Sequence, residues 1–190
     1  VILWGAWVRI TGSGAGCGDH WPTCGGKIIP PSPSTETLIE FSHRLTSGLT
    51  LILAIVLVVY ARRQFESGHL VRKAALTTLV FVLLEAALGA VLVLQGLVAK
   101  DTSVARAVIS ALHLGNTLGL VGFGALTAWW SAQRNPGWGT PPSSFKTKAV
   151  VIGLIAVGMM IYLTRETLKV PNTQSATGIL YAAVVLVFLG

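Results

Sequence analysis

The segment "LIEFSHRLTSGLTLILAIVLVVY", residues 38–60, decides the fold class of this protein. It ends in a long apolar run, and a helix that crosses a bilayer needs about 20 mostly apolar residues. Its first turns nevertheless carry Glu40, His43 and Arg44. Ionisable side chains inside a spanning helix are costly and usually serve a function. The segment therefore predicts a transmembrane helix with a functional site near one end.

The composition of the whole chain indicates the same class. Of the 190 residues, 53% are hydrophobic and only 11% are charged. Soluble domains carry about 25% charged residues, so we expect an integral membrane protein in a lipid bilayer. The net charge is +7, but the basic residues lie in loops and at helix ends and form no tail that would bind nucleic acid. No nucleic-acid partner is expected.

Apolar runs along the chain predict an all-α fold, a polytopic transmembrane helix bundle. Residues 1–10 read as the end of a first spanning helix, and a long loop of turn-forming residues follows at 11–38. Further helices are predicted at 39–61, 74–98, 106–131 and 148–164, and another from near residue 177. The helix at 39–61 is expected to be N-capped by Thr35 or Thr37.

These elements predict three regions. Residues 1–131 are expected to form a four-helix unit with an incomplete first helix, 132–147 a cytoplasmic linker, and 148–190 further spans that are truncated. Both ends of the sequence look cut through hydrophobic helices, so we expect it to be part of a longer protein.

Charge patterning predicts the orientation in the membrane. Arg62, Arg63, Arg72 and Lys73 crowd one short loop, and such loops face the cytoplasm under the positive-inside rule. The opposite loop, which holds the two cysteines, is then expected on the outer side, where a disulfide can persist.

Two histidines are predicted at similar depth on separate helices. His43 lies roughly 6 Å inside the outer end of its helix, at about 1.5 Å per residue. His113 lies roughly 10 Å below the same face, because its helix runs the other way. Facing histidines on separate helices are what a six-coordinate haem needs. The alternative is that each imidazole only bonds a nearby backbone or hydroxyl group.

The polar residues around these histidines allow two interpretations each. Glu40 shares a helical face with His43, and could orient it, act as a general base, or complement the helix dipole. Arg44 could pair with a haem propionate or extend to lipid headgroups. Asn116 could bond a ligand or join two helices. Glu85, deeper in the bundle, could belong to a proton path or bond a neighbouring helix.

The outer loop contains Cys17 and Cys24, with six residues between them. A structural disulfide that holds the loop over the bundle is one interpretation, and a redox-active pair that relays electrons is the other. A zinc site that adds His20 lacks an evident fourth ligand.

Three stretches together resemble the haem A synthase family: "GAWVRITGSGAGCGDHWPTCGGKIIP", "IEFSHRLTSG" and "ALHLGNTLGL". That family oxidises a ring methyl of haem O to the formyl group of haem A. The resemblance covers roughly residues 4–131 and matches the amino-terminal half of the family, of the type with cysteines in the first outer loop.

The resemblance implies a role for each matching residue. His43 and His113 would ligate the iron of substrate haem O, and Glu40 would be the acidic residue implicated in catalysis. Cys17 and Cys24 would form the disulfide that many bacterial members carry. Full-length members repeat the four-helix unit, and the second half supplies a histidine pair for a permanent haem B. No histidine follows His113 here, so either the second half is truncated or the chain is a relative that keeps one haem site.

The sequence is thus interpreted as a haem-dependent oxidoreductase, a haem A synthase that serves terminal oxidases. Its expected location is the plasma membrane of a bacterium or archaeon. Expected partners are haem O, a quinol or other electron donor, and a haem O synthase or oxidase assembly proteins. The alternatives are a non-catalytic bis-histidine cytochrome subunit of a respiratory complex and a membrane thiol–disulfide oxidoreductase that uses Cys17 and Cys24.

Overall fold

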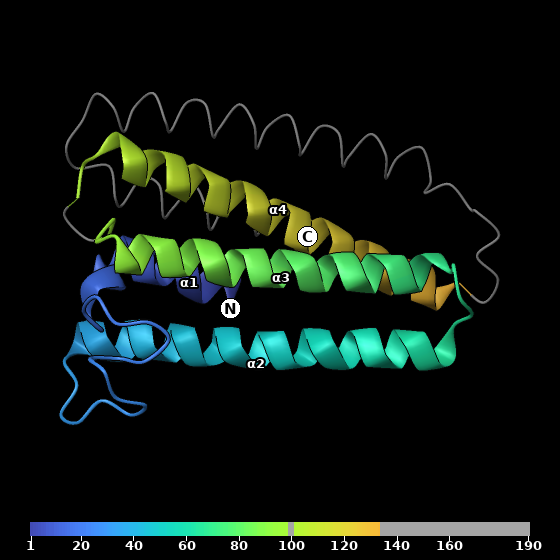
Figure 1. Ribbon diagram of the computed structural model, residues 1–190, viewed down its shortest axis with the longest axis horizontal. Helices are drawn as coiled ribbons and strands as arrows, with labels where there is room; N and C mark the ends of the chain where they lie inside the picture. Colours follow the sequence, from blue (N-terminus) through green and yellow to red (C-terminus); the bar gives the residue numbers. More distant parts are fainter. Residues whose placement is uncertain (99–100, 134–190) are drawn as a thin grey trace.

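The computed structural model describes residues 1–98 and 101–133, and every structural statement below concerns these residues. They form an all-helical bundle, as the sequence predicted (Figure 1). The elements in chain order are α1 (Ile2–Ile10), the 3-10 turn η1 (Ser13–Ala15), α2 (Thr35–Gln64), α3 (Leu70–Leu94) and α4 (Val104–Ala132).

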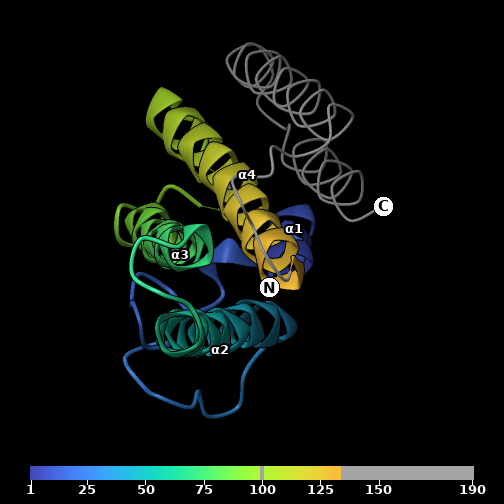
Figure 2. The same ribbon diagram turned by 90° about the vertical axis from the view of Figure 1, so that its right-hand side faces the viewer.

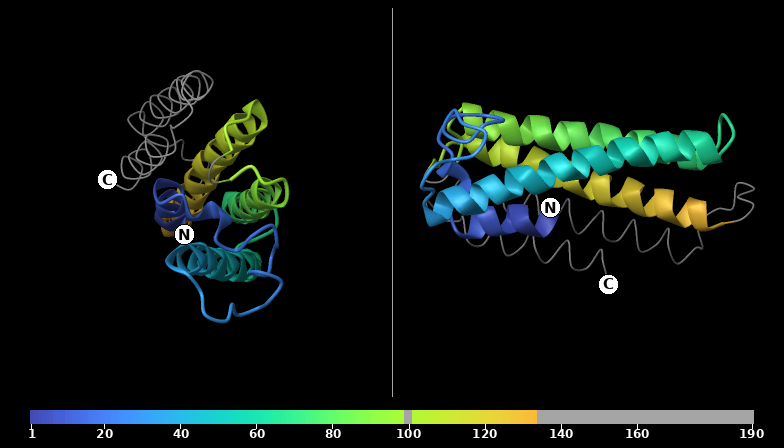
Figure 3. Two further views of the ribbon diagram at one scale, coloured as in Figure 1. Left: turned by 90° about the vertical axis from the view of Figure 1, so that its left-hand side faces the viewer. Right: turned by 90° about the horizontal axis from the view of Figure 1, so that it is seen from below.

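Three of the described helices, α2, α3 and α4, are long and apolar enough to cross a membrane. They lie side by side along the long axis of the bundle, and the short helix α1 occupies one end, next to the cysteine loop (Figures 1 and 3). The connection between α2 and α3 lies at the opposite end. Seen along the bundle axis, the helices surround a common interior (Figure 2). The expectation of an integral membrane protein therefore holds.

The helix ends differ from the predicted ones by a few residues, for local reasons. The N-cap of α2 is Ser34, whose side chain accepts the Thr37 N–H at 3.2 Å, so the prediction of Thr35 or Thr37 was wrong. Helix α3 begins earlier than predicted because the side chain of His69 caps it. It ends at Leu94 rather than 98, since Gly96 has a φ of 65° that stops the helix.

The helices pack through small side chains and expose large ones. One buried cluster joins Val58 and Ala61 of α2 to Val71 and Ala75 of α3. Large apolar residues of α2 point outward; Ile52, for example, is 59% exposed. This pattern suits a bundle in lipid, where small residues let helices approach and large ones face the hydrocarbon.

The predicted helices at 148–164 and from near 177, and most of the predicted linker at 132–147, lie outside the described residues. The division into three regions stays a prediction.

Candidate functional site

A cavity of about 400 Å³ lies among the described helices at the end that carries the cysteine loop. Its walls come from α1, α2, α3 and α4 and from the loop residue Trp21. Pockets for small organic ligands measure about 300–1,000 Å³ and are mostly apolar with a few polar groups. The cavity has this character, so it is the candidate site.

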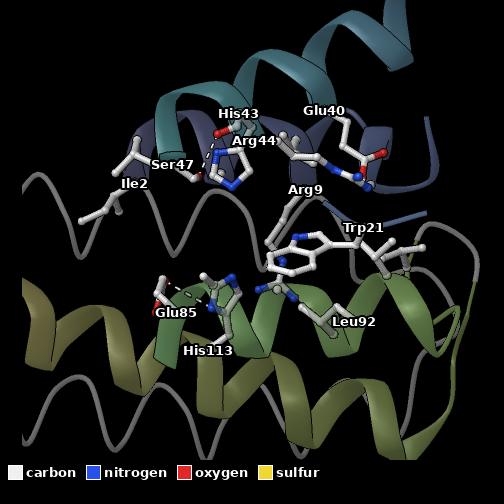
Figure 4. A pocket seen from close by; sticks show the side chains of 18 of the residues that line it. Ile2, Arg9, Trp21, Glu40, His43, Arg44, Ser47, Glu85, Leu92 and His113 are labelled. Atoms are coloured by element: carbon white, nitrogen blue, oxygen red, sulfur yellow. Dashed lines mark hydrogen bonds and ion pairs between the residues drawn. The ribbon is translucent and has the colours of Figure 1, made fainter. Parts of the chain in front are cut away.

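His43 and His113 face each other across this cavity, His43 from α2 and His113 from α4 (Figure 4). His43 and His113, which the sequence predicts at similar depth on separate helices, therefore line one cavity. Both side chains are only partly exposed, because the surrounding helices shield them. Two imidazoles on opposite walls of one cavity could each offer a nitrogen to the iron of a bound haem.

His43 is set in place by contacts between α1 and α2. Trp4 Nε1 donates a hydrogen bond to Ser42 Oγ at 2.9 Å, which ties α1 to the residue before His43. Gly5 faces the imidazole so closely that a Cβ there would lie 3.0 Å from His43 Cε1. The Nδ1 atom of His43 is buried and has no hydrogen-bond partner among the described residues. A buried polar atom without a partner is uncommon and suggests a functional constraint.

Glu40 is buried, and its carboxylate is engaged by the cysteine loop. Oε2 accepts the backbone N–H of Cys17 at 2.8 Å, and Oε1 accepts from the Arg44 guanidinium, with Nε at 3.1 Å. Figure 4 shows the carboxylate turned toward Arg44 rather than toward the His43 imidazole. Both residues line the cavity. The catalytic role of Glu40 and the binding of a cofactor by Arg44 stay predictions.

Arg44 extends the same network into the loop. Its Nη1 donates to the backbone carbonyl of His20 at 2.6 Å and to that of Thr23 at 2.5 Å. Of the two roles considered from the sequence, the structure shows neither; it shows Arg44 bonded to protein carbonyls. Arg44 and Glu40 together hold the loop against the start of α2.

The structure joins Cys17 and Cys24 in a disulfide, and each cysteine is only 2% exposed. Thr37 Oγ1 donates to the Gly16 carbonyl at 2.7 Å, which docks the loop on α2. A Cβ on Gly16 would lie 2.5 Å from the backbone of Glu36, so this approach requires glycine. The loop is therefore packed closely on the bundle beside the cavity.

Glu85 of α3 meets three groups of α4. Asn116 Nδ2 donates to its Oε2 and Thr117 Oγ1 to its Oε1, both at 2.5 Å. His113 Nδ1 lies 3.2 Å from Oε1. Asn116 also donates to the Phe81 carbonyl at 2.9 Å. Asn116 thus links two helices in the structure, and its contact with a cofactor stays a prediction.

The residues that line the cavity and that the sequence interpretation missed include Arg9, Trp21 and Arg106. Arg9 and Trp21 point into the cavity in the close view (Figure 4). Arg9 was visible in the sequence as a charge at the end of an apolar helix, and Arg106 as a charge at the start of another. With Arg44 they place three guanidinium groups on the cavity wall, which also carries the carboxylates of Glu40 and Glu85.

These residues fit a haem better than a bare metal ion. No group of three or more His, Cys, Asp or Glu side chains within residues 1–98 and 101–133 is arranged to hold a metal. A zinc site needs at least three protein ligands, whereas a porphyrin supplies its own four nitrogens and takes one or two axial ligands from the protein. The two imidazoles match this need for protein ligands. The apolar walls suit the porphyrin ring, and the arginines suit its propionates.

The fold and site define a class: a transmembrane helix bundle with a pair of facing histidines beside a disulfide-closed loop. The chain belongs to the cytochrome oxidase assembly protein family, whose model matches residues 1–189. This confirms the resemblance to the haem A synthase family that the sequence motifs indicated.

The chain is also similar to curated proteins of two names, two of them heme A synthases and one a farnesyltransferase. The chain is 51% identical over 136 residues to a protoheme IX farnesyltransferase of Thermus thermophilus, a match that covers 72% of this chain and 22% of the relative. It is 39% identical over 115 residues to a heme A synthase of Alkalihalophilus pseudofirmus, covering 60% of this chain and 36% of the relative. A heme A synthase of Bacillus mycoides is 42% identical over 96 residues, covering 50% and 31%.

The chain thus spans between about a fifth and two fifths of the length of these relatives. No solved structure matches it.

Proposed function

We propose that this chain forms the substrate unit of a haem A synthase, which oxidises the ring methyl of haem O to a formyl group and so supplies haem A to terminal oxidases. The observation that carries the proposal is the placement of His43 and His113 on opposite walls of one cavity. Membership in the cytochrome oxidase assembly protein family supports it, as do the relatives that are named heme A synthase.

In this proposal each cavity residue has a role toward the substrate. His43 and His113 bind the iron of haem O through their imidazole nitrogens. Haem iron supplies the oxidative chemistry, and the protein supplies ligation, orientation and shielding from water. Glu40 is the proposed catalytic acid–base group, and its contact with Arg44 fixes its position. Arg44, Arg9 and Arg106 provide positive charge for the propionates.

We further propose a haem O synthase as the source of the substrate. The relative from Thermus thermophilus is named as a protoheme IX farnesyltransferase, yet about a fifth of its length matches this chain. A match inside such a chain suggests that the synthesis of haem O and the oxidation of haem O are physically coupled. Conversion of the methyl to a formyl group removes four electrons and adds one oxygen atom, so we take dioxygen as the oxidant and oxygen source. A quinol or another membrane donor supplies the further electrons with which dioxygen is reduced to water. A second histidine pair for haem B is expected in the part of the family's length that this chain does not span.

The proposed orientation places the cysteine loop on the outer side of a bacterial or archaeal plasma membrane. Arg62, Arg63, Arg72 and Lys73 lie around the connection between α2 and α3, which is at the opposite end of the bundle from the loop (Figure 1). Basic residues of short loops face the cytoplasm. The cavity then opens near the outer face.

The test is a pigment analysis of the full-length gene product, in which extracted haems are identified by mass. Wild type is compared with His43→Ala, His113→Ala and Glu40→Ala. His20→Ala is the matched control, since its imidazole lies in the exposed part of the loop and does not line the cavity. We expect wild type and His20→Ala to hold haem O together with hydroxylated or formyl products. Glu40→Ala is expected to accumulate unmodified haem O.

Two other results would overturn the proposal. Unmodified haem B alone, with no effect of Glu40→Ala, would identify a bis-histidine cytochrome. Complete absence of haem from wild type would show that His43 and His113 do not bind haem. A thiol–disulfide oxidoreductase, in turn, would keep its activity after His43→Ala and lose it after Cys17→Ser.

A further inference from the structure

The contact between His113 and Glu85 distinguishes the two histidines of the cavity. Nδ1 of His113 lies 3.2 Å from Oε1 of Glu85, whose carboxylate belongs to the neighbouring helix α3. Nδ1 of His43 is also buried and, like Nδ1 of His113, makes no regular hydrogen bond in the described part of the chain, but no carboxylate there forms an ion pair with it. The cavity therefore presents one imidazole backed by a carboxylate and one without such backing.

The position of the Glu85 carboxylate is determined by several contacts at once. Asn116 and Thr117 donate to its two oxygens, each at 2.5 Å. Thr117 is fully buried and Asn116 is 9% exposed. His113, Asn116 and Thr117 are spaced three and four residues apart, so they lie on one face of α4. A carboxylate inside a membrane bundle is costly unless it is paired, and here one face of α4 supplies the partners.

The contact between Glu85 and His113 decides which nitrogen of the His113 imidazole can bind a metal. A neutral imidazole carries one N–H donor and one lone pair, and the partner of one nitrogen decides which nitrogen is free to bind a metal. A carboxylate beside Nδ1 favours the proton there and leaves Nε2 as the ligand. Carboxylates in this position orient the imidazole and raise its basicity as a ligand. In the structure, the His113 Nδ1 contact with Glu85 does not have the geometry of a regular hydrogen bond. Contacts of this kind often become shorter and better aligned when the ligand binds.

We propose that Glu85 is a positioning residue that makes His113 the anchoring ligand of the haem, while His43 is the weaker and more readily released ligand. This inference rests on the proposed haem site and goes beyond it, because it assigns unequal roles to the two histidines. An exchangeable ligand on one side suits a unit that must take up a substrate haem and release a product haem.

The experiment is a titration of the purified full-length protein with ferric haem B, followed by optical spectra and a redox titration of the bound haem. Glu85→Gln is compared with wild type, because it keeps the shape of the side chain and removes its charge. Thr78→Val is the matched control: the Thr78 and Thr127 hydroxyls are 3.5 Å apart in the same α3–α4 interface, and neither residue lines the cavity.

We expect Glu85→Gln to lower haem affinity by about 10- to 100-fold, the usual effect of losing such a partner. The midpoint potential should rise, since a less basic His113 stabilises ferric iron less. Thr78→Val should change neither. A purely structural role for Glu85 would lower the melting temperature of the variant without shifting the potential of the haem that still binds.

The two single histidine variants provide a second measurement that does not require Glu85→Gln to fold. His43→Ala is expected to retain haem in a five-coordinate, high-spin form, and His113→Ala to lose it. Equal behaviour of the two variants, or a Glu85→Gln protein with wild-type affinity and potential, would overturn the inference while leaving the haem site intact. If wild type itself bound no haem at these histidines, the proposed function and this inference would both fall.

Discussion

The carboxylate of Glu40 accepts the backbone N–H of Cys17 at 2.8 Å, which links the start of a membrane helix directly to the disulfide loop. The same carboxylate holds Arg44, and Arg44 holds two carbonyls of the loop. The loop, the helix end and the cavity wall therefore form one connected unit. A change in Glu40 is expected to affect the loop as well as any chemistry in the cavity.

Glu40→Ala is expected to speed reduction of the Cys17–Cys24 disulfide by dithiothreitol. Hydrogen bonds to a charged group contribute about 1.5–3 kcal/mol. Their loss should therefore raise the population of the open loop by about tenfold or more. The rate is measured from the appearance of thiols. Glu36→Ala is the control, because Glu36 is exposed in the same helix. An unchanged rate in Glu40→Ala would show that the network does not hold the loop closed.

Gly119→Ala is expected to destabilise the contact between α3 and α4. A Cβ at Gly119 would lie 2.3 Å from Phe81 Cε1, and the Phe81 ring is stacked on Phe123. Overpacking of this kind costs about 1–3 kcal/mol, which should appear as a lower melting temperature in detergent. Gly122→Ala on the same helix meets no atom within 4 Å and should be neutral or slightly stabilising. Equal melting temperatures for the two variants would contradict the packing.

Gly89→Leu is expected to block haem binding without unfolding the protein. Gly89 lines the cavity, and a Cβ there meets nothing within 4 Å, so a larger side chain would occupy space that a ligand needs. Gly124→Leu is the control, since Gly124 is equally open but does not line the cavity. Haem content and melting temperature are measured for both. Normal haem content in Gly89→Leu would place the haem elsewhere.

Arg106→Gln is expected to weaken haem binding about tenfold through the loss of a charge-assisted hydrogen bond to a propionate. Arg106 is half-buried, lines the cavity and also donates to the Asp101 carbonyl. Binding of haem dimethyl ester, which lacks the propionate charge, should be the same in both proteins. Arg72→Gln, away from the cavity, serves as the control. A loss with the dimethyl ester as large as with haem would indicate a change in the cavity shape instead.

The sequence predicted the membrane helices well, because apolar length is a local property of the chain. It also predicted that His43 and His113 lie at similar depth on separate helices, since the rise of a helix converts residue number into depth, and both line one cavity. Helix ends were less accurate: Ser34 and His69 act as caps through side-chain bonds to the backbone, and neighbouring residues of similar chemistry were equally good candidates.

Only the tertiary structure decided what each polar group contacts. Glu40 shares a helical face with His43 in the sequence pattern, yet its carboxylate bonds a loop residue that is 23 positions away along the chain. The backing of His113 by Glu85 required two helices to pack at one particular register. By itself the sequence determined the membrane class, the helices and the histidine pair, because these follow from short-range periodicity and length. The partners of Glu40, Arg44 and Glu85 depend on how loop and helices meet in space, and no local pattern carries that information.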